Sequence, residues 1–336
     1  MIRMLKIAPQ KALAVPALAL ALAASPVSAF EWPDWQSPHY RDHPLAGTIW
    51  RGDGSPADRA ALAAAVIAAD YVLLGEIHNN PDHHRIQAML IGELVAAGRR
   101  PTIVFEMIPA GLQKQLDDHL AGSPNDAAGL GPAVQWEARN WPDWSIYQPI
   151  AEVALEAGLK LKAGNLDRDV VQRIGKTGAA ALDPALAERF GLNRPLDPEL
   201  QADLMETLKE SHCNLLPEAA LAPMLTVQRA RDGALADAML SAGKKGGAAL
   251  IAGTGHVRRD WAAAAAIKAR VRDAKIVSVA LVEVEEAYNS FSEYDFAADA
   301  ADLPFDYVVF TPRADLTDHC AELTKRFGKK PPHKSE

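Results

Sequence analysis

Short apolar runs alternate with longer amphipathic runs along most of the chain. Runs that are apolar at consecutive positions, as in strands buried on both faces, occur at 71–76, 101–108, 159–166, 248–256, 275–284 and 306–312. Amphipathic stretches that predict helices lie at 81–97, 109–120, 145–157, 197–212, 217–242 and 256–270. This alternation predicts an α/β fold with a mostly parallel central sheet, flanked by helices on both faces.

Two features precede the first long apolar run. The segment GTIW at 47–50 predicts a short first strand. A helix is then expected to start at Ser55 as its N-cap, with Pro56 in the first helical position and a long Ala-rich run behind it.

The first 29 residues have the pattern of a secretory signal peptide. Arg3, Lys6 and Lys11 supply its positive charge, ALAVPALALALAA its apolar stretch, and small residues stand where a signal peptidase reads. The apolar stretch is too short and too interrupted by proline to span a membrane. We expect cleavage after Ala29 and a periplasmic or secreted protein without an integral membrane span.

The predicted organisation follows from these patterns. Its parts are a signal peptide (1–29), an irregular N-terminal arm (30–46), a single α/β domain (47–320) with a helical insertion at about 168–242, and a flexible basic tail (321–336). The chain has 35 Lys and Arg against 43 Asp and Glu, or 32 against 43 without the signal segment. A chain this acidic is a poor candidate for binding nucleic acid through its overall field.

Cysteine usage excludes two kinds of metal site. No CxxC pair is present, so a zinc cage of that type is excluded, and the lack of CxxCH excludes covalent c-type haem. Export would permit a disulfide between Cys213 and Cys320. Cys213 could equally be a soft ligand or a buried small residue, which is the commonest fate of a free cysteine.

Three of the predicted strands end in polar residues that a core would not hold. They are Glu76 and His78 in GEIH, Glu106 in FEM and His256 in GTGH. Parallel strands bring their carboxyl ends to one edge of the sheet, where α/β proteins bind ligands, so one cleft is expected to hold all four. Such a set could bind a divalent metal through His78, Glu106 and His256, or move protons in acid–base catalysis.

The segment NNPDHH, directly after His78, carries helix-start signals. Pro81 suits the first helical position, with Asn80 as the N-cap and Asp82 at the positive helix end. His78 and His83 are five apart with a proline between them, so they cannot share a helix face as the histidines of HExxH do. His83 is therefore either an ordinary polar residue of the turn or a ligand.

The ordered set of motifs resembles the Tiki/TraB superfamily, which includes erythromycin-esterase-like proteins. The motifs are LLGEIHNNPDHHRIQ, VFEMI, NWPDWSIYQPI, HCNLLP, QRARDGALADAM and IAGTGHVRRDWA. Within the superfamily the chain is most similar to the ChaN family of haem-binding, iron-uptake proteins. The resemblance implies one α/β domain whose cleft is formed by Glu76, His78, Glu106, Arg231 and His256.

By this resemblance the ligand is haem. Aromatic side chains that could line a flat macrocycle's pocket are Trp136, Trp141, Trp144 and Tyr147. Tyr147 is the predicted axial ligand, with His83 and His84 as further ligands or propionate partners. Alternatively, the tryptophans fill a hydrophobic corner under the helical insertion.

Three functional hypotheses remain. The leading one is an exported haem- or iron-binding uptake protein whose partner is haem or an iron complex, with a homodimer allowed. The second is a periplasmic hydrolase, metal-dependent or esterase-like, that uses the Gly-x-x-His cleft. In the third, the chain is a structural or interaction protein, and the cleft is a relic without a function. Many ChaN relatives are lipoproteins, whereas the first cysteine here is Cys213, so no lipid anchor is expected.

Overall fold

The computed structural model describes residues 32, 34–241, 246–297 and 303–327. The predicted signal peptide and most of the predicted basic tail lie outside these residues. Within them the chain forms one eight-stranded sheet in the order β2-β1-β8-β7-β3-β6-β4-β5. The strands are β1 (Ile49–Arg51), β2 (Pro56–Ala57), β3 (Tyr71–Glu76), β4 (Thr102–Pro109), β5 (Leu161–Asn165), β6 (Ala248–Gly253), β7 (Ile276–Glu283) and β8 (Tyr307–Thr311).

The predicted α/β class, with a mostly parallel sheet, is confirmed. Strands β3 to β8 pair in parallel, and β1 and β2 add an antiparallel edge. The helices are α1 (Arg59–Ala68), α2 (Pro81–Ala96), α3 (Gln113–Gly122), α4 (Ala127–Ala133), α5 (Trp144–Glu156), α6 (Arg168–Thr177), α7 (Pro184–Arg189), α8 (Pro198–Ser211), α9 (Glu218–Leu240), α10 (Ala263–Arg270) and α11 (His319–Phe327).

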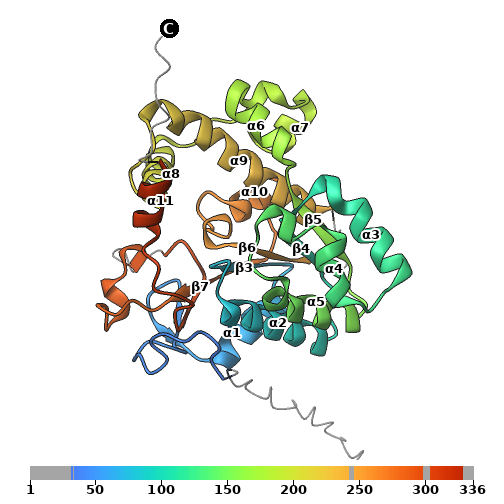
Figure 1. Cartoon of the computed structure of the whole chain (residues 1–336), viewed down its shortest axis with the longest axis vertical. Helices are drawn as coiled ribbons and strands as arrows, with labels where there is room; N and C mark the ends of the chain where they lie inside the picture. The colour runs from blue at the N-terminus through green and yellow to red at the C-terminus, as the bar shows by residue number, and fades with distance from the viewer. Residues whose placement is uncertain (1–31, 33, 242–245, 298–302, 328–336) are drawn as a thin grey trace, which may run out of the picture.

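Helices cover both faces of the sheet, as the uninterrupted apolar runs require. Along β3, Val72 and Leu74 pack with α1, α2 and α5, whereas Tyr71 and Leu73 pack with α9 and α10. Figure 1 shows α1, α2 and α5 on one side of β3 and β6, with α9 and α10 on the other. Both faces of the central strands are therefore buried in hydrophobic core. For this reason their sequences do not alternate between apolar and polar residues.

Local capping confirms one predicted helix start and corrects another. Asn80 caps α2 by accepting from the backbone N–H groups of Asp82 and His83, with Pro81 in the first turn. The helix expected from Ser55 begins later, because Pro56 pairs with β1 as part of β2. Asp58 is the actual N-cap of α1, and its carboxylate accepts from the Ala61 N–H at 2.7 Å.

The stretch predicted as one helix over 256–270 is also divided. A 3-10 turn spans Thr254–His256, directly after β6, and α10 begins only at Ala263. The predicted strand over 248–256 correspondingly ends at Gly253. Glycines and a histidine thus leave the sheet as a tight turn, which aims His256 back toward the strand ends.

The region from α6 to α9 has a small core of its own. Leu204 and Leu208 of α8 pack with Leu225 of α9 and with Trp261 and Ala262, which lie before α10. The second half of α9 belongs instead to the core that covers the sheet. Helix α9 therefore connects this helical region to the main body of the fold, as Figure 1 shows.

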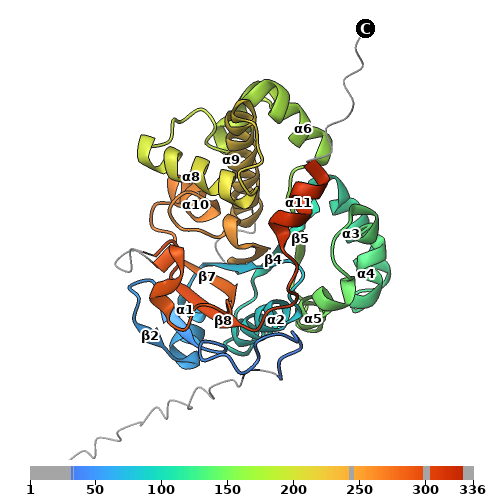
Figure 2. The ribbon, with the colours of Figure 1, turned by 60° about the vertical axis from the view of Figure 1, so that its left-hand side comes forward.

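A disulfide joins Cys213 to Cys320, with a Cα–Cα distance of 5.4 Å. Among the alternatives that the sequence left open for Cys213, the structure selects pairing over a ligand or a free buried thiol. The bond ties the loop after α8 to α11, which Figure 2 shows at the end of the red segment that follows β8. No helix in the described ranges is long and apolar enough to cross a membrane.

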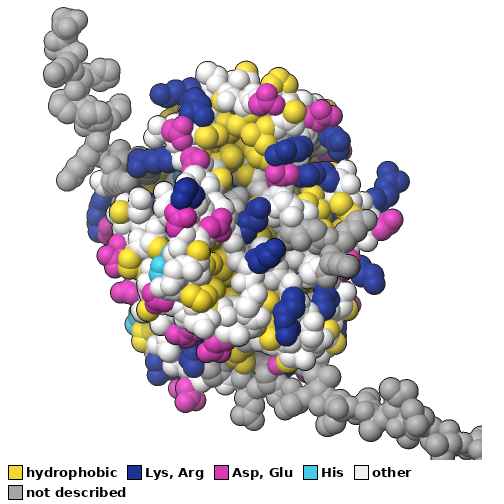
Figure 3. All heavy atoms as spheres, turned by 90° about the vertical axis from the view of Figure 1, so that its right-hand side faces the viewer, with side chains coloured by type: hydrophobic (Ala, Val, Ile, Leu, Met, Phe, Trp, Pro, Cys, Tyr) yellow, Lys and Arg dark blue, Asp and Glu magenta, His cyan; other side chains and the backbone are white. Residues whose placement is uncertain are grey.

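The surface carries mixed charge. On the face shown in Figure 3, Lys and Arg side chains are interspersed with Asp and Glu, and hydrophobic side chains gather near the top of the view. On this face, therefore, neither charge forms an uninterrupted area.

Candidate functional site

The predicted strand ends meet at the carboxyl edge of the sheet. Strands β3 and β4 both pair with β6 and flank it. Glu76 is the last residue of β3, Glu106 lies near the end of β4, and Gly253 ends β6 between them. Two histidines, His78 and His256, follow β3 and β6 within a few residues. The fold thus brings together the side chains that the Gly-x-x-His motifs predicted.

Glu76 is buried and holds three neighbours. Its Oε1 accepts from His78 Nδ1 at 2.8 Å and from the Tyr147 hydroxyl. Its Oε2 accepts from the side-chain amide of Gln87 at 2.8 Å. Burial would raise the pKa of Glu76, but His84 and His78 outweigh it and hold that pKa well below the usual range. Glu76 is therefore a fixed anion beneath His78.

The His78 imidazole is the most open polar group of the site, with 33% of its side chain exposed. The Trp141 ring lies edge-on to it, with ring centroids 4.9 Å apart. Burial would lower the pKa of His78, but Glu76 and Glu106 raise it. With Nδ1 bonded to Glu76, Nε2 makes no hydrogen bond to any described residue and lies over Gly253, so it is the atom that can meet a ligand.

Glu106 forms the second anionic centre. Its Oε1 accepts from Arg231 Nη2 at 2.7 Å and lies 3.3 Å from His256 Nε2, while its Oε2 accepts from the backbone N–H of Gly253 at 2.8 Å. Burial would raise the pKa of Glu106, but His256 and Arg231 lower it far below its usual range. Arg231 also lies 3.3 Å from Asn165 and keeps 29% of its side chain exposed.

His256 lies between two carboxylates. Its Nδ1 is 2.7 Å from Asp232 Oδ1, and its Nε2 faces Glu106. Burial would lower the pKa of His256, but Glu106 and Asp232 raise it to about 9. The carboxylates thus favour the imidazolium form of His256 at neutral pH, with each ring nitrogen facing a carboxylate.

A divalent metal is not supported. Among the residues that the structure describes, no group of three His, Cys, Asp or Glu side chains is arranged to hold a metal ion. Of the predicted ligands His78, Glu106 and His256, Glu106 is hydrogen-bonded to Arg231 and Gly253, and His256 lies between two carboxylates. In this structure the carboxylates of the cleft form ion pairs with Arg231 and His256.

His83 supports the turn and does not face the cleft. It is fully buried; Nδ1 accepts the Ile77 N–H at 2.9 Å, and Nε2 bonds the Thr311 hydroxyl at 2.8 Å. Burial lowers the pKa of His83 to about 3, so the ring is neutral. Of the two interpretations that the sequence allowed, the geometry favours the structural one.

His84 and Tyr147 lie behind His78. Both are fully buried, and their rings stack with centroids 3.8 Å apart. His84 Nε2 bonds the His78 carbonyl at 3.1 Å, and the Tyr147 hydroxyl donates to Glu76. Burial and Glu76 raise the pKa of Tyr147, which disfavours the tyrosinate that iron ligation needs. The structure places both residues as supports for Glu76 and His78.

The aromatic segment divides between core and site. Trp136 and Trp144 are buried core residues, but they pack with α2, α4 and α5 and not under the helical insertion that the alternative named, while Trp141 stays partly exposed beside His78. Arg139, which sequence reasoning missed, lies over Trp136 at 5.7 Å and donates to the Met107 carbonyl. Its Nη2 is buried without a partner among the described residues, and burial lowers its pKa to about 10.

Two exposed apolar side chains lie next to His78 in sequence or in a segment that is linked to it. Ile77 is 38% exposed and Leu316 55% exposed. They come from distant segments that a hydrogen bond of 2.5 Å between Asn79 and Asp315 holds together. The exposed apolar surface of Ile77 is therefore adjacent in sequence to His78, and the segment of Leu316 is tied to the residue that follows His78.

Comparisons with known proteins identify the family and support the fold. The family model described as "Haem-binding uptake, Tiki superfamily, ChaN" matches residues 62–267. The solved structure "Cofacial heme binding to ChaN of Campylobacter jejuni" is 22% identical, with a TM-score of 0.57, over 78% of this chain and 95% of that chain. No protein with a curated description matches the sequence.

Two further solved structures are more distantly similar. A mutant of the erythromycin esterase EreC, in its open conformation, is 14% identical with a TM-score of 0.45, over 78% of this chain and 95% of that chain. The type III effector HopBA1 is 13% identical with a TM-score of 0.41, over 84% of this chain and 99% of that chain. Neither score is high enough to carry an argument about function.

Proposed function

Because the chain belongs to the ChaN-type haem-binding uptake family of the Tiki superfamily, we propose that it binds haem beside His78, as an exported protein of haem or iron uptake. The observation that carries the proposal is the state of the His78 imidazole. Glu76 accepts from Nδ1 and fixes the ring, while Nε2 has no partner among the described residues. Metal-ligating histidines characteristically donate their other ring N–H to a carboxylate.

The residues around His78 fit the shape and charge of haem. When bound, haem supplies an iron that accepts an axial ligand and a flat apolar ring with two propionates. Trp141 and Ile77 offer apolar surface beside His78. Arg139, a partly exposed cation over Trp136 in the same aromatic segment, suits a propionate. Together these groups match an amphipathic anion better than a small polar substrate.

Two further elements of the proposal concern location and assembly. The signal-like first 29 residues support export, and the disulfide agrees with it, because disulfides persist in oxidising compartments. The Campylobacter jejuni structure is described by cofacial haem binding. If two haems stack at His78, the outer ring needs a second surface, so we include a haem-dependent homodimer in the proposal.

A haem titration of the chain from residue 30 tests the proposal. We expect a saturable Soret shift, weakened about tenfold or more by His78→Ala, because the axial ligand is lost. Tyr147→Phe should change affinity less, since the ring stays and only the bond to Glu76 is lost. His119→Asn, on α3, is the control. A flat titration contradicts haem binding, and loss of the shift in Tyr147→Phe alone would move the ligand to Tyr147.

A second candidate, esterase-like hydrolysis, is favoured by the same His78–Glu76 pair. An imidazole oriented by a carboxylate can take a proton from water, and Arg231 could stabilise the anion that forms. His256 is protonated and would serve as a charge. Ester turnover lost in His78→Ala, in haem-free protein, would support this reaction. Absence of turnover across an ester and peptide screen of the wild type would exclude it.

A further inference from the structure

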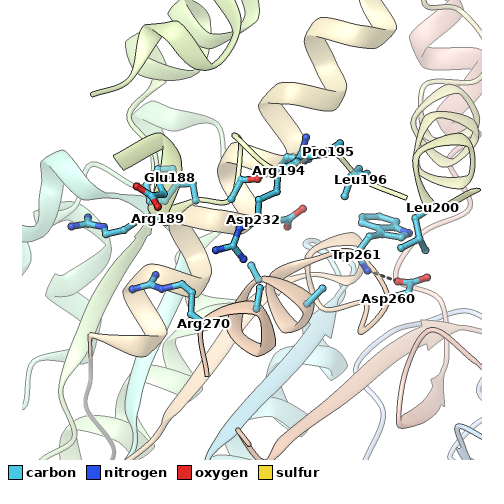
Figure 4. A pocket seen from close by; sticks show the side chains of 16 residues that line it. Glu188, Arg189, Arg194, Pro195, Leu196, Leu200, Asp232, Asp260, Trp261 and Arg270 are labelled. Atoms are coloured by element: carbon cyan, nitrogen blue, oxygen red, sulfur yellow. Dashed lines mark hydrogen bonds between the residues drawn. The ribbon is translucent and has the colours of Figure 1, made fainter. Parts of the chain in front are cut away.

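A second pocket lies on the far side of Asp232 from His256. It is formed by the end of α7, the segment from 190 to 200, the middle of α9 and the helix α10, and it has a volume of about 250 Å³. Figure 4 shows Asp232 between an arginine side, with Arg189 and Arg270, and an apolar side, with Leu200 and Trp261. None of the residues proposed to meet haem lines it.

Most of the charges around this pocket neutralise one another. Arg189 and Arg270 both bond Asp237, at 3.0 and 2.7 Å. Asp260 is paired with Arg258 at 2.6 Å. Asp232 is likewise compensated by the protonated His256. The acidic side chains at the pocket are therefore largely engaged, apart from the exposed Glu188 at its margin.

Two arginines of the pocket have no acidic partner in the described ranges. Arg229 donates to the backbone carbonyls of Gly191 and Arg194, at 2.8 and 2.6 Å. These acceptors are neutral, so the positive charge of this half-buried side chain is not balanced by them. The Arg194 side chain makes no hydrogen bond or ion pair to a described residue. Arg194 is exposed to solvent and Arg229 is half-buried, and a guanidinium that lacks a carboxylate can pair with an external anion.

A third unsatisfied group is the indole of Trp261. The residue is buried, yet its Nε1–H has no hydrogen-bond partner among the residues described, and such orphan donors are rare in folded proteins. Its ring belongs to the apolar wall, which also includes Phe190, Leu196, Leu200, Ala265, Ala266 and Ala269. The pocket thus combines two cations with an apolar interior.

We propose that this pocket is a binding site for a small monocarboxylate with an apolar body, with the carboxylate at Arg194 and Arg229 and the body against Trp261. A volume of about 250 Å³ lies below the roughly 300–1,000 Å³ of pockets for drug-sized ligands, so a short chain or a single ring fits and a macrocycle does not. The ligand would lie one side chain from the His256–Glu106 network, because Asp232 borders both.

Calorimetric titration of the haem-free chain from residue 30 tests this site with octanoate, octan-1-ol and acetate as probes. We expect octanoate to bind with a Kd below about 1 mM, and the other two to bind at least about tenfold more weakly, since each lacks one half of the chemistry. Arg194→Gln should weaken octanoate about tenfold. Trp261→Phe, which keeps an aromatic ring but removes part of the apolar wall, should weaken it a few fold.

The matched control is Arg173→Gln, an exposed arginine of α6 outside the pocket. Arg194 has no internal partner, so its substitution should leave the fold intact. No saturable octanoate binding, equal binding of octan-1-ol, or equal weakening by Arg173→Gln would each overturn the proposal. The measurement uses no haem, so failure of the haem titration and failure of this site are separate results.

Discussion

His78 and His256 follow the same Gly-x-x-His pattern, but the structure gives them opposite chemistry. His78 has one carboxylate partner, a third of its side chain exposed and a ring nitrogen without a partner among the described residues. His256 is buried between Glu106 and Asp232 and is protonated at neutral pH. The difference arises from carboxylates that other elements supply, so one histidine suits ligation and the other a fixed charge.

A single methyl group beside His78 should test its role. A Cβ at Gly253 would lie 3.1 Å from His78 Nε2, whereas a Cβ at Gly255 would meet nothing within 4 Å. Gly253 has φ −56°, which alanine adopts freely. We expect Gly253→Ala to push the imidazole aside and weaken haem binding about tenfold, while Gly255→Ala leaves it unchanged. Equal haem affinity in the two variants would contradict the placement of the ligand.

The raised pKa of His256 should appear as a pH dependence of stability. Its folded pKa of about 9 exceeds the roughly 6.5 of an unfolded histidine, so its stabilising contribution is complete below pH 6.5. That contribution is lost as the pH rises toward 9, with a slope of at most about 1.4 kcal/mol per pH unit. Urea unfolding from pH 6 to 9.5 should show this slope. His256→Gln should flatten it, and a slope that persists in that variant would assign it to another group.

At the scale of elements, β3 sets the geometry of the cleft. It is flanked in parallel by β6 and β7 and covered on both faces, so its side chains have no room to spare. Gly75 stands where the turn after β6 crosses it. A Cβ there would lie 2.5 Å from Val257 Cγ2 and 3.1 Å from Thr254 Cα. The glycine therefore permits the close approach that places Glu76 beside the second Gly-x-x-His turn.

Gly75→Ala should consequently be destabilising. Overpacking at a site this tight costs about 1–3 kcal/mol of unfolding free energy. Gly92 in α2 is the matched control, because a Cβ there meets nothing within 4 Å and alanine is the better helix former by about 1 kcal/mol. Urea denaturation of both variants measures the difference. If the Gly75→Ala variant unfolded at the same urea concentration as the wild type, the turn after β6 would be able to move away at little cost in free energy.

The sequence predicted secondary-structure elements well where neighbouring residues determine their ends. It predicted them less well where pairing between strands determines them. Helix α2 was expected from Asn80 and Pro81, and it begins there because the cap is built from adjacent residues. The helix expected from Ser55 was wrong because Pro56 pairs with β1, a contact that a local pattern does not contain. Arg139 was missed for a similar reason, since its site depends on Met107 and Trp136.

At the scale of the whole molecule, a covalent link joins two distant parts of the chain. Cys213 and Cys320 are 107 residues apart, and their bond fixes α11 to the loop after α8. Closing so long a loop removes conformational freedom mainly from the unfolded chain. The link thus holds the C-terminal helix to the helical region that contains the second pocket.

Removing this disulfide should lower stability without altering the cleft. The double variant Cys213→Ala, Cys320→Ala is expected to lose about 2–4 kcal/mol of unfolding free energy. Urea denaturation of the oxidised wild type, the reduced wild type and the variant checks this. Reduction should reproduce the variant, and haem affinity of the native state should stay within a few fold. An unchanged midpoint in both would show that the link does not constrain the unfolded chain.

The sequence by itself determined the α/β class, most strands and helices, and the edge of the sheet where polar residues gather. These features depend on hydrophobic periodicity, caps and strand-end residues, which neighbouring positions encode. Only the tertiary structure decided which histidine is open, that Tyr147 is buried behind Glu76, that the cysteines pair, and that Arg194 and Trp261 border one pocket. Each of these depends on side chains from distant segments, whose distances and burial no local pattern contains.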